Sequence, residues 1–164
     1  DVNQGWKDWH TVINMLGWIK EQGVELVEQP MPVKMTEEMR RVKEHSPLPL
    51  FADESVKRLK DIDAVAEQFH GINIKLMKST GMAEAFKMIK KARELKLGVF
   101  LGCMAESSCA TTAMAQLMGL ADHIDLDAPN LYKNDPFEGA AYKDGQVVLS
   151  DLPGLGLRIR KEIF

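Results

Sequence analysis

The stretch PLFADESVKRLKDIDAVAEQFHGINIKLM (49–77) places two short apolar runs on either side of a helical pattern. PLFADES (49–55) and GINIKLM (71–77) have the length, the Ile, Leu and Phe content, and the Gly or Pro boundaries of buried strands. The residues between them, about 61–69, predict a short helix. Because strands that alternate with helices form parallel sheets, this stretch predicts a βαβ unit.

The same alternation extends outward in both directions. Further strands are predicted at 24–30, 98–104 and 123–129, and their near-continuous apolar character suits strands covered on both faces. The remaining helices are predicted at about 8–22, 36–46, 82–95 and 107–120. No GxGxxG follows the first strand, which leaves a dinucleotide-binding Rossmann unit unsupported. After residue 129 the pattern changes to a hairpin at 141–149 and a tight turn at 153–157. The fold class is therefore α/β.

Composition narrows the class of protein further. The 164 residues suffice for one domain, and 45% hydrophobic with 27% charged residues is ordinary for a soluble globular protein. A net charge of −3 without a basic stripe gives no reason to expect nucleic acid, and no apolar run approaches the roughly 20 residues of a membrane span. The cysteines, Cys103 and Cys109, suit a reducing compartment, so a cytoplasmic location is expected.

Ionisable side chains stand at the carboxyl end of every predicted strand. Asp1 holds the same place at the start of the chain, where we expect the end of a preceding strand. In a parallel β/α barrel, catalytic groups gather at this face. The strand-end groups are Asp1, Glu28, Asp53, Lys75, Glu106, Asp125 and Asp127.

These residue types predict a particular chemistry. Three carboxylates on adjacent strands form an all-oxygen site of the kind that suits Mg²⁺. Such a metal holds a substrate carboxylate and stabilises the enolate that forms when the neighbouring α-proton leaves. A lysine beside the metal has a lowered pKa and acts as a base. The additional acids predict a substrate that also carries a cation.

Four motifs make the pattern familiar. DVNQGW (1–6), VEQP (27–30), ADES (52–55) and NIKLMK (73–78) occur in order, with spacings between Asp1, Glu28, Asp53 and Lys75 of 27, 25 and 22 residues. They resemble the third to sixth barrel strands of the muconate-lactonizing subgroup of the enolase superfamily. GCMAES (102–107) and DLD (125–127) resemble the dipeptide epimerases within it.

The resemblance implies a TIM-type barrel and assigns roles to individual residues. Mg²⁺ is expected to bind Asp1, Glu28 and Asp53, and Lys75 is expected to be one of two acid/base lysines on opposite faces of the substrate. Cys103 is expected to lie against the substrate, and Asp125 and Asp127 to receive its α-ammonium group. The implied reaction inverts the α-carbon of the C-terminal residue of a dipeptide by 1,1-proton transfer through an enolate.

The family pattern also contains parts that residues 1–164 lack. These are a K-x-K lysine on the second barrel strand and an N-terminal capping domain. A complete barrel needs roughly 250 residues, so we expect 1–164 to be the C-terminal part of the catalytic barrel, with about six of its eight strands. We expect the full-length protein to be a homo-oligomer and this part alone to be inactive.

Other interpretations remain open at this point. The same metal scaffold serves cycloisomerases and o-succinylbenzoate synthases, although their substrates lack a partner for Asp125 and Asp127. A catalytically incomplete chain that only binds or assembles is the second alternative. Asp125 and Asp127 could also cap a turn, and Glu106 could orient Lys75 or complete a polar network. Lys78 is predicted to be a neighbour of the site, either solvated or supporting the residues that act there, rather than the base.

Overall fold

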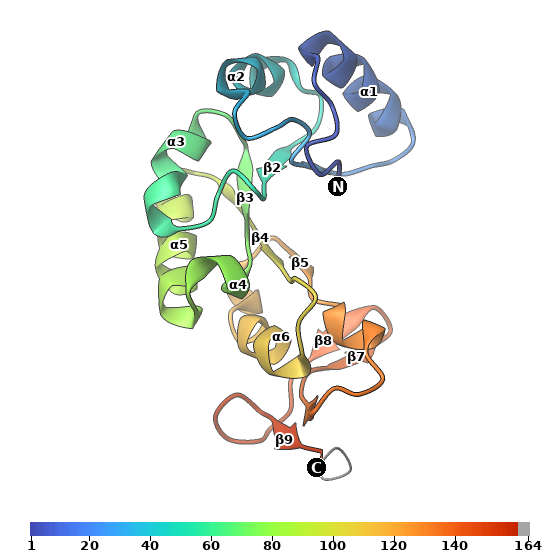
Figure 1. Cartoon of the computed structure of the whole chain (residues 1–164), viewed down its shortest axis with the longest axis vertical. Helices are drawn as coiled ribbons and strands as arrows, with labels where there is room; N and C mark the ends of the chain where they lie inside the picture. Colours follow the sequence, from blue (N-terminus) through green and yellow to red (C-terminus); the bar gives the residue numbers. More distant parts are fainter. Residues whose placement is uncertain (161–164) are drawn as a thin grey trace.

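The computed structural model describes residues 1–160 and contains a five-stranded parallel sheet (Figure 1). Its strands lie side by side in chain order, and every neighbouring pair is parallel. The strands are β1 (Val27–Glu28), β2 (Leu50–Ala52), β3 (Gly71–Ile74), β4 (Gly98–Gly102) and β5 (His123–Asp125). All five predicted strands are therefore present, although each is shorter than its predicted range. The α/β class and the barrel-type strand order are confirmed.

The position predicted for a sixth strand is held by residues 1–4. The backbone N–H of Val2 donates to the carbonyl of Glu28 at 3.1 Å, and that of Gln4 donates to the carbonyl of Gln29 at 2.8 Å. These residues form no regular strand, because Asn3 and Gln4 have φ values of 49° and 63°. The N-terminal segment nevertheless runs beside β1, which brings Asp1 next to the end of that strand.

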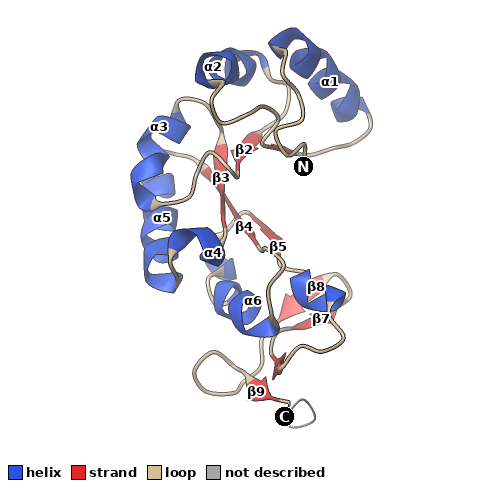
Figure 2. Cartoon of the chain, in the orientation of Figure 1, coloured by secondary structure: helices blue, strands red, loops and turns tan. Residues whose placement is uncertain are grey.

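Helices cover one side of this sheet (Figure 2). Ala85, Met88, Ile89 and Ala92 are buried on the inner face of their helix, as predicted. One helix was not predicted: GINIKLM leaves the sheet at Ile74 and turns into α4 (Leu76–Ser79), which places Lys75 at the junction. The other helices are α1 (Trp9–Glu21), α2 (Thr36–His45), α3 (Ile62–Ala66), α5 (Met82–Glu94) and α6 (Ser108–Ala115), with short 3-10 turns η1 (Leu59–Asp61) and η2 (Met118–Leu120).

The face of the sheet opposite the helices is filled by aromatic rings. Successive side chains of a strand point to opposite faces, so Phe51 faces away from its neighbours Leu50 and Ala52. Gly71 and Gly98 leave room for the Phe51 ring, because a Cβ on these glycines would lie 2.3 Å and 2.8 Å from it. The ring also meets two others edge-on, those of Phe100 and His123.

The next layer on this face is polar or small. Each member of this layer lies two positions after a residue that forms or borders the cluster of rings. It therefore points to the same face of the sheet. Because the strands are parallel, this layer lies at the carboxyl ends of all of them. It comprises Asp53, Asn73, Gly102 and Asp125. The aromatic rings thus form a floor, and the ionisable groups lie above it.

The remainder of the chain is less regular. The predicted hairpin is present as β7 (Ala141–Lys143) and β8 (Gln146–Val148), with positive φ at Asp144 and Gly145 in the turn. A 3-10 turn, η3 (Ala128–Leu131), follows β5. The pairing of β6 (Phe137–Glu138) with β9 (Arg158–Ile159) was not predicted, because two-residue strands give no periodic signal. Among the described residues, none of the helices has the length and apolar character needed to span a bilayer.

Candidate active site

Three carboxylates meet where the polar layer reaches β1 and the N-terminal segment. Asp1, Glu28 and Asp53 each offer an oxygen, and these oxygens all lie within 4.8 Å of one another. Glu28 and Asp53 are buried, whereas Asp1 is exposed and accepts a hydrogen bond from the Asn3 backbone N–H at 2.8 Å. The sequence analysis predicted this cluster. Burial raises the pKa of Glu28, and the neighbouring charge of Asp53 raises it further, because two close carboxylates oppose each other's ionisation.

Lys75 lies against two of these carboxylates. Its Nζ is 2.7 Å from Asp53 Oδ2 and 3.6 Å from Glu28 Oε1. Burial alone would lower the pKa of Lys75, but the hydrogen bond and charge of Asp53 outweigh burial and raise it. The structure therefore brings the predicted base and the predicted metal ligands into direct contact.

Lys78 is a buried neighbour that supports Asp53, one of the two forms predicted for it, and it is not solvated. Its side chain is only 9% exposed, and it forms an ion pair with Asp53 Oδ1. Its Nζ also donates to the backbone carbonyls of Asp53 at 2.8 Å and Asn73 at 3.1 Å. An ammonium group has three hydrogens, and all three are used here. Lys78 therefore holds Asp53 in place and is poorly suited to taking a proton from a substrate.

One buried amide orients the Glu28 carboxylate and another fixes the backbone at Asp53, and neither was predicted from the sequence. Asn73 Nδ2 donates to Glu28 Oε1 at 2.8 Å. Gln29 Oε1 accepts from the backbone N–H groups of Asp53 and Ser55, both at 3.1 Å, which fixes the start of the loop after β2. The available signals were a polar residue inside the apolar strand GINI and an amide immediately after Glu28.

A second acidic group stands at the end of β5. Burial raises the pKa of Asp125, and the charge of Asp127 adds to this rise, whereas the charge of Lys75 lowers it. Cys103 Sγ lies 4.0 Å from Asp127 Oδ1. The phenol of Tyr142, on β7, donates to the carbonyl of Leu126, the residue between the two aspartates. The hairpin thus restrains the segment that carries both acids.

Tyr142 should titrate well above an ordinary tyrosine. Burial, followed by the negative charges around it, raises its pKa to about 12. The folded state favours the neutral phenol, so its contribution to stability is complete below pH 10 and is lost as the pH rises toward 12. We expect the difference in ultraviolet absorbance between the protein and its Tyr142→Phe variant to have a midpoint of about 12. A midpoint near 10, with circular dichroism showing an intact fold, would contradict this expectation.

Glu106 is buried, and its charge acts on Cys103. Burial raises the pKa of Glu106, and Lys75 is among the charges that act on it in the opposite direction. Its Oε2 accepts weakly from the Met104 backbone N–H at 3.4 Å, and its Oε1 has no hydrogen-bond partner within residues 1–160. Neither of its two predicted roles, orienting Lys75 or completing a polar network, is tested by these contacts.

The three-carboxylate cluster fits a divalent cation. Its donors are all oxygens, which Mg²⁺ prefers, and their spacing allows one ion to reach all three. Two of these carboxylates, Glu28 and Asp53, already lie against the ammonium groups of Lys75 and Lys78.

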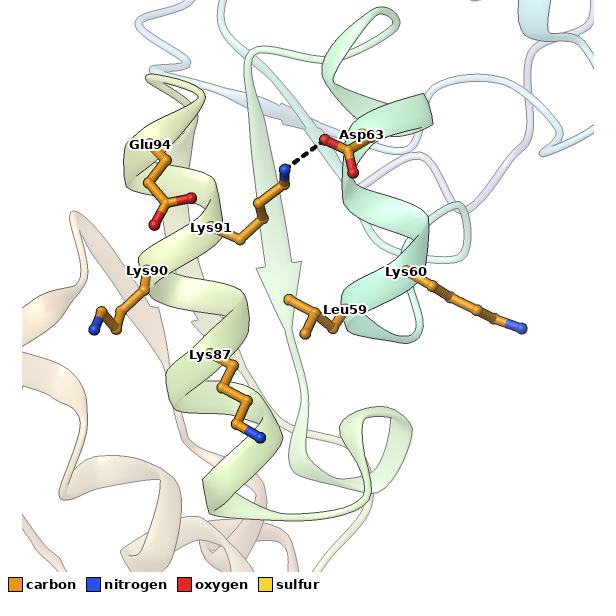
Figure 3. Close-up of a pocket in the computed structure, with 7 residues that line it drawn as sticks. All are labelled: Leu59, Lys60, Asp63, Lys87, Lys90, Lys91 and Glu94. Atoms are coloured by element: carbon orange, nitrogen blue, oxygen red, sulfur yellow. Dashed lines mark ion pairs between the residues drawn. The ribbon is translucent and has the colours of Figure 1, made fainter.

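A separate hollow of about 480 Å³ lies on the outside of the helical layer, between α3, η1 and α5. Although four lysines line it, Figure 3 shows that the side chains of Lys60 and Lys90 extend away from each other. Lys91 pairs with Asp63 at 2.7 Å across the hollow. Its ammonium groups do not converge on one point, so the hollow is not an anion site.

Comparison with known proteins places this arrangement in a family. The model described as "Enolase C-terminal domain-like" matches residues 1–163. The chain belongs to this family. Its barrel-type sheet is therefore that of an enolase C-terminal domain, and the expected resemblance to the superfamily is confirmed.

Individual members of the enolase superfamily are also similar to the chain. An L-Ala-D/L-Glu epimerase of Bacteroides thetaiotaomicron is 48% identical over 157 residues, which cover 96% of this chain and 41% of that protein. The substrate-liganded L-Ala-D/L-Glu epimerase of Bacillus subtilis is 30% identical with a TM-score of 0.87, covering 94% of this chain and 45% of that one. A dipeptide epimerase of Cytophaga hutchinsonii, complexed with Mg and D-Ala-L-Val, is 25% identical with a TM-score of 0.89, covering 98% and 45%. The chain thus spans less than half the length of each.

Proposed function

We propose that this chain forms part of the active site of a Mg²⁺-dependent dipeptide epimerase. The reaction is the inversion of the α-carbon of the C-terminal residue of a dipeptide by 1,1-proton transfer. The observation that carries the proposal is the contact of Lys75 Nζ with Asp53 at 2.7 Å, inside a cluster of three carboxylates. The epimerases of B. thetaiotaomicron and C. hutchinsonii support it by similarity.

Different residues of the chain have different roles in this reaction. Asp1, Glu28 and Asp53 would hold the metal. When bound, Mg²⁺ would supply positive charge to the substrate carboxylate and to the anion that remains after the α-proton leaves, and would offset the carboxylates that raise the pKa of Lys75. Lys75 in its neutral form takes the α-proton on one face of the substrate, and in the reverse direction its ammonium returns a proton there.

Inversion requires a second acid/base group on the opposite face of the α-carbon. Lys78 does not meet this need, because its three hydrogens bond to Asp53 and Asn73. We assign the second role to a lysine of the K-x-K strand, in the part of the barrel outside these residues. The capping domain of the superfamily would complete the substrate site, and the expected homo-oligomer would consist of such complete subunits.

We assign the binding of the substrate amino group to the acids at the end of β5. Asp125 and Asp127 offer two negative charges to an ammonium group, and Cys103 Sγ lies 4.0 Å from Asp127 Oδ1. A protonated amine near Asp125 would offset the burial that raises its pKa. This preference for a cation separates dipeptides from the substrates of cycloisomerases and o-succinylbenzoate synthases.

The proposal is tested by solvent-deuterium exchange with the full-length protein and Mg²⁺. A dipeptide library is incubated in D₂O, and mass spectrometry should find one deuterium at the α-carbon of the C-terminal residue of the substrates. Chelation of the metal should abolish this exchange. A matched library with acetylated amino groups is the control for the ammonium site. Exchange restricted to the acetylated library, or ring formation without exchange, would replace the proposal by an alternative function.

A further inference from the structure

We infer that Asn73 is a positioning residue for the metal ligands and that Gly102 is small because Asn73 must lie over it. The inference rests on the proposed metal site. It gives Asn73 and Gly102 a role in the affinity of that site for its metal ion. It begins with the hydrogen bond from Asn73 Nδ2 to Glu28 Oε1, which is 2.8 Å long and fully buried.

The orientation of the Asn73 amide is fixed by Glu28. Asn73 is 2% exposed, and its Oδ1 has no hydrogen-bond partner among the described residues. A flipped amide would place that oxygen against a carboxylate oxygen, which is repulsive, whereas the observed orientation donates a proton to it. The buried side-chain oxygen of Asn73 is thus left without a partner among the described residues, whereas Glu28 receives a hydrogen bond. The amide uses one lone pair of Glu28 Oε1, which leaves the rest of the carboxylate to share a cation with Asp1 and Asp53, whose oxygens lie within 4.8 Å.

Asn73 also reaches the second buried ligand through its backbone. Its carbonyl accepts from Lys78 Nζ at 3.1 Å, and the same Nζ pairs with the Asp53 carboxylate. The side chain of Asn73 therefore restrains Glu28, and its main chain restrains Asp53 through Lys78. One residue of β3 couples the ligands of β1 and β2.

Gly102 on β4 makes this position of Asn73 sterically available. A Cβ at residue 102 would lie 2.5 Å from Asn73 Oδ1, 2.7 Å from Nδ2 and 3.0 Å from Cγ. Contacts this short force the amide to move away. Because the backbone of Gly102 does not have a positive φ, the reason for glycine is this contact rather than the conformation of the chain.

The test measures the dissociation constant of Mn²⁺, as a probe of the metal site, and the melting temperature of each metal-free variant of the full-length protein. Asn73→Leu removes the donor and keeps the number and branching of the side-chain heavy atoms, and it should weaken Mn²⁺ binding about 10- to 100-fold. Gln68→Leu is the matched control. Gln68 is a similarly buried amide, 6% exposed, that bonds to the Ala64 carbonyl on the helical side. It should lower the melting temperature and leave the Mn²⁺ dissociation constant unchanged.

Gly102→Ala supplies an independent arm, because it keeps every hydrogen-bonding group. It should also weaken Mn²⁺ binding, and it should add no further loss in a background of Asn73→Ala, where no amide remains to be displaced. An unchanged Mn²⁺ dissociation constant in folded Asn73→Leu or in Gly102→Ala would overturn the inference. Failure of the unmodified protein to bind Mn²⁺ would instead refute the proposed metal site.

Discussion

Replacement of Lys75 by Ala in the full-length protein should abolish epimerisation, with a loss of about 10³-fold or more in kcat. A positioned general base contributes roughly 10²- to 10⁴-fold to such a reaction, and no neighbouring group can replace it. Lys78, the neighbouring lysine, is held by three hydrogen bonds. The measurement is the rate of inversion together with the washout of the α-proton into D₂O, starting separately from each stereoisomer.

The two stereoisomers distinguish a lost base from a damaged site. Lys75 serves one face of the α-carbon, so exchange should disappear from the isomer whose α-hydrogen points to that face. Exchange retained from both isomers would contradict the role of Lys75. Lys75→Arg keeps the positive charge beside Asp53 but removes an accessible neutral form, so it should be as inactive as Lys75→Ala. Lys91→Ala, which removes a lysine of the outer helical face, should have normal rates.

Much of the fold was predictable because its signals are local and repeated. Each apolar run such as GINI is bounded by Gly or Pro and follows an amphipathic helix, so strand order and parallel direction follow from the alternation alone. Strand ends were less predictable. GINIKLM continues its apolar character through Leu76 and Met77, and only the change from the extended Lys75 to the helical residues after it ends the strand.

The charged members of the site were predictable, but the residues that hold them in place were not. Asp53 and Lys75 follow strands at a regular spacing, and parallel strands bring such positions together. The contact of Asn73 with Glu28 joins residues 45 positions apart, and that of Gly102 with Asn73 depends on a missing Cβ. Burial of Lys78 depends on the turn into α4. Such contacts arise from the register of the sheet, so a single sequence can show a polar residue out of place, as in GINI, but not the partner that it contacts.

Asp53→Asn should have the second large effect, because Asp53 serves both the metal and two buried ammonium groups. Its side chain is 7% exposed, and it pairs with Lys75 and Lys78, which are 12% and 9% exposed. Breaking a buried ion pair by removing one partner costs on the order of 3–5 kcal/mol. We expect the metal-free protein to lose about 3 kcal/mol of unfolding free energy in urea and to lose detectable Mn²⁺ binding. Asp63→Asn is the control: Asp63 pairs with Lys91 but is 67% exposed, so its loss should cost less than about 1 kcal/mol.

A second variant separates the two roles of Asp53. Burial alone would raise the pKa of Asp53, but Lys78 and Lys75 together lower it, so its stabilising charge is present at neutral pH and is lost only as the pH falls through its folded-state pKa. At pH 7, Asp53→Asn therefore leaves Lys78 buried without a counter-charge. Asp53→Asn combined with Lys78→Met removes that unpaired charge and should recover most of the lost stability. Mn²⁺ binding should stay absent, because methionine restores packing without supplying a carboxylate. Recovery of both properties would mean that Asp53 acts only by pairing with Lys78, and recovery of stability alone identifies it as a ligand.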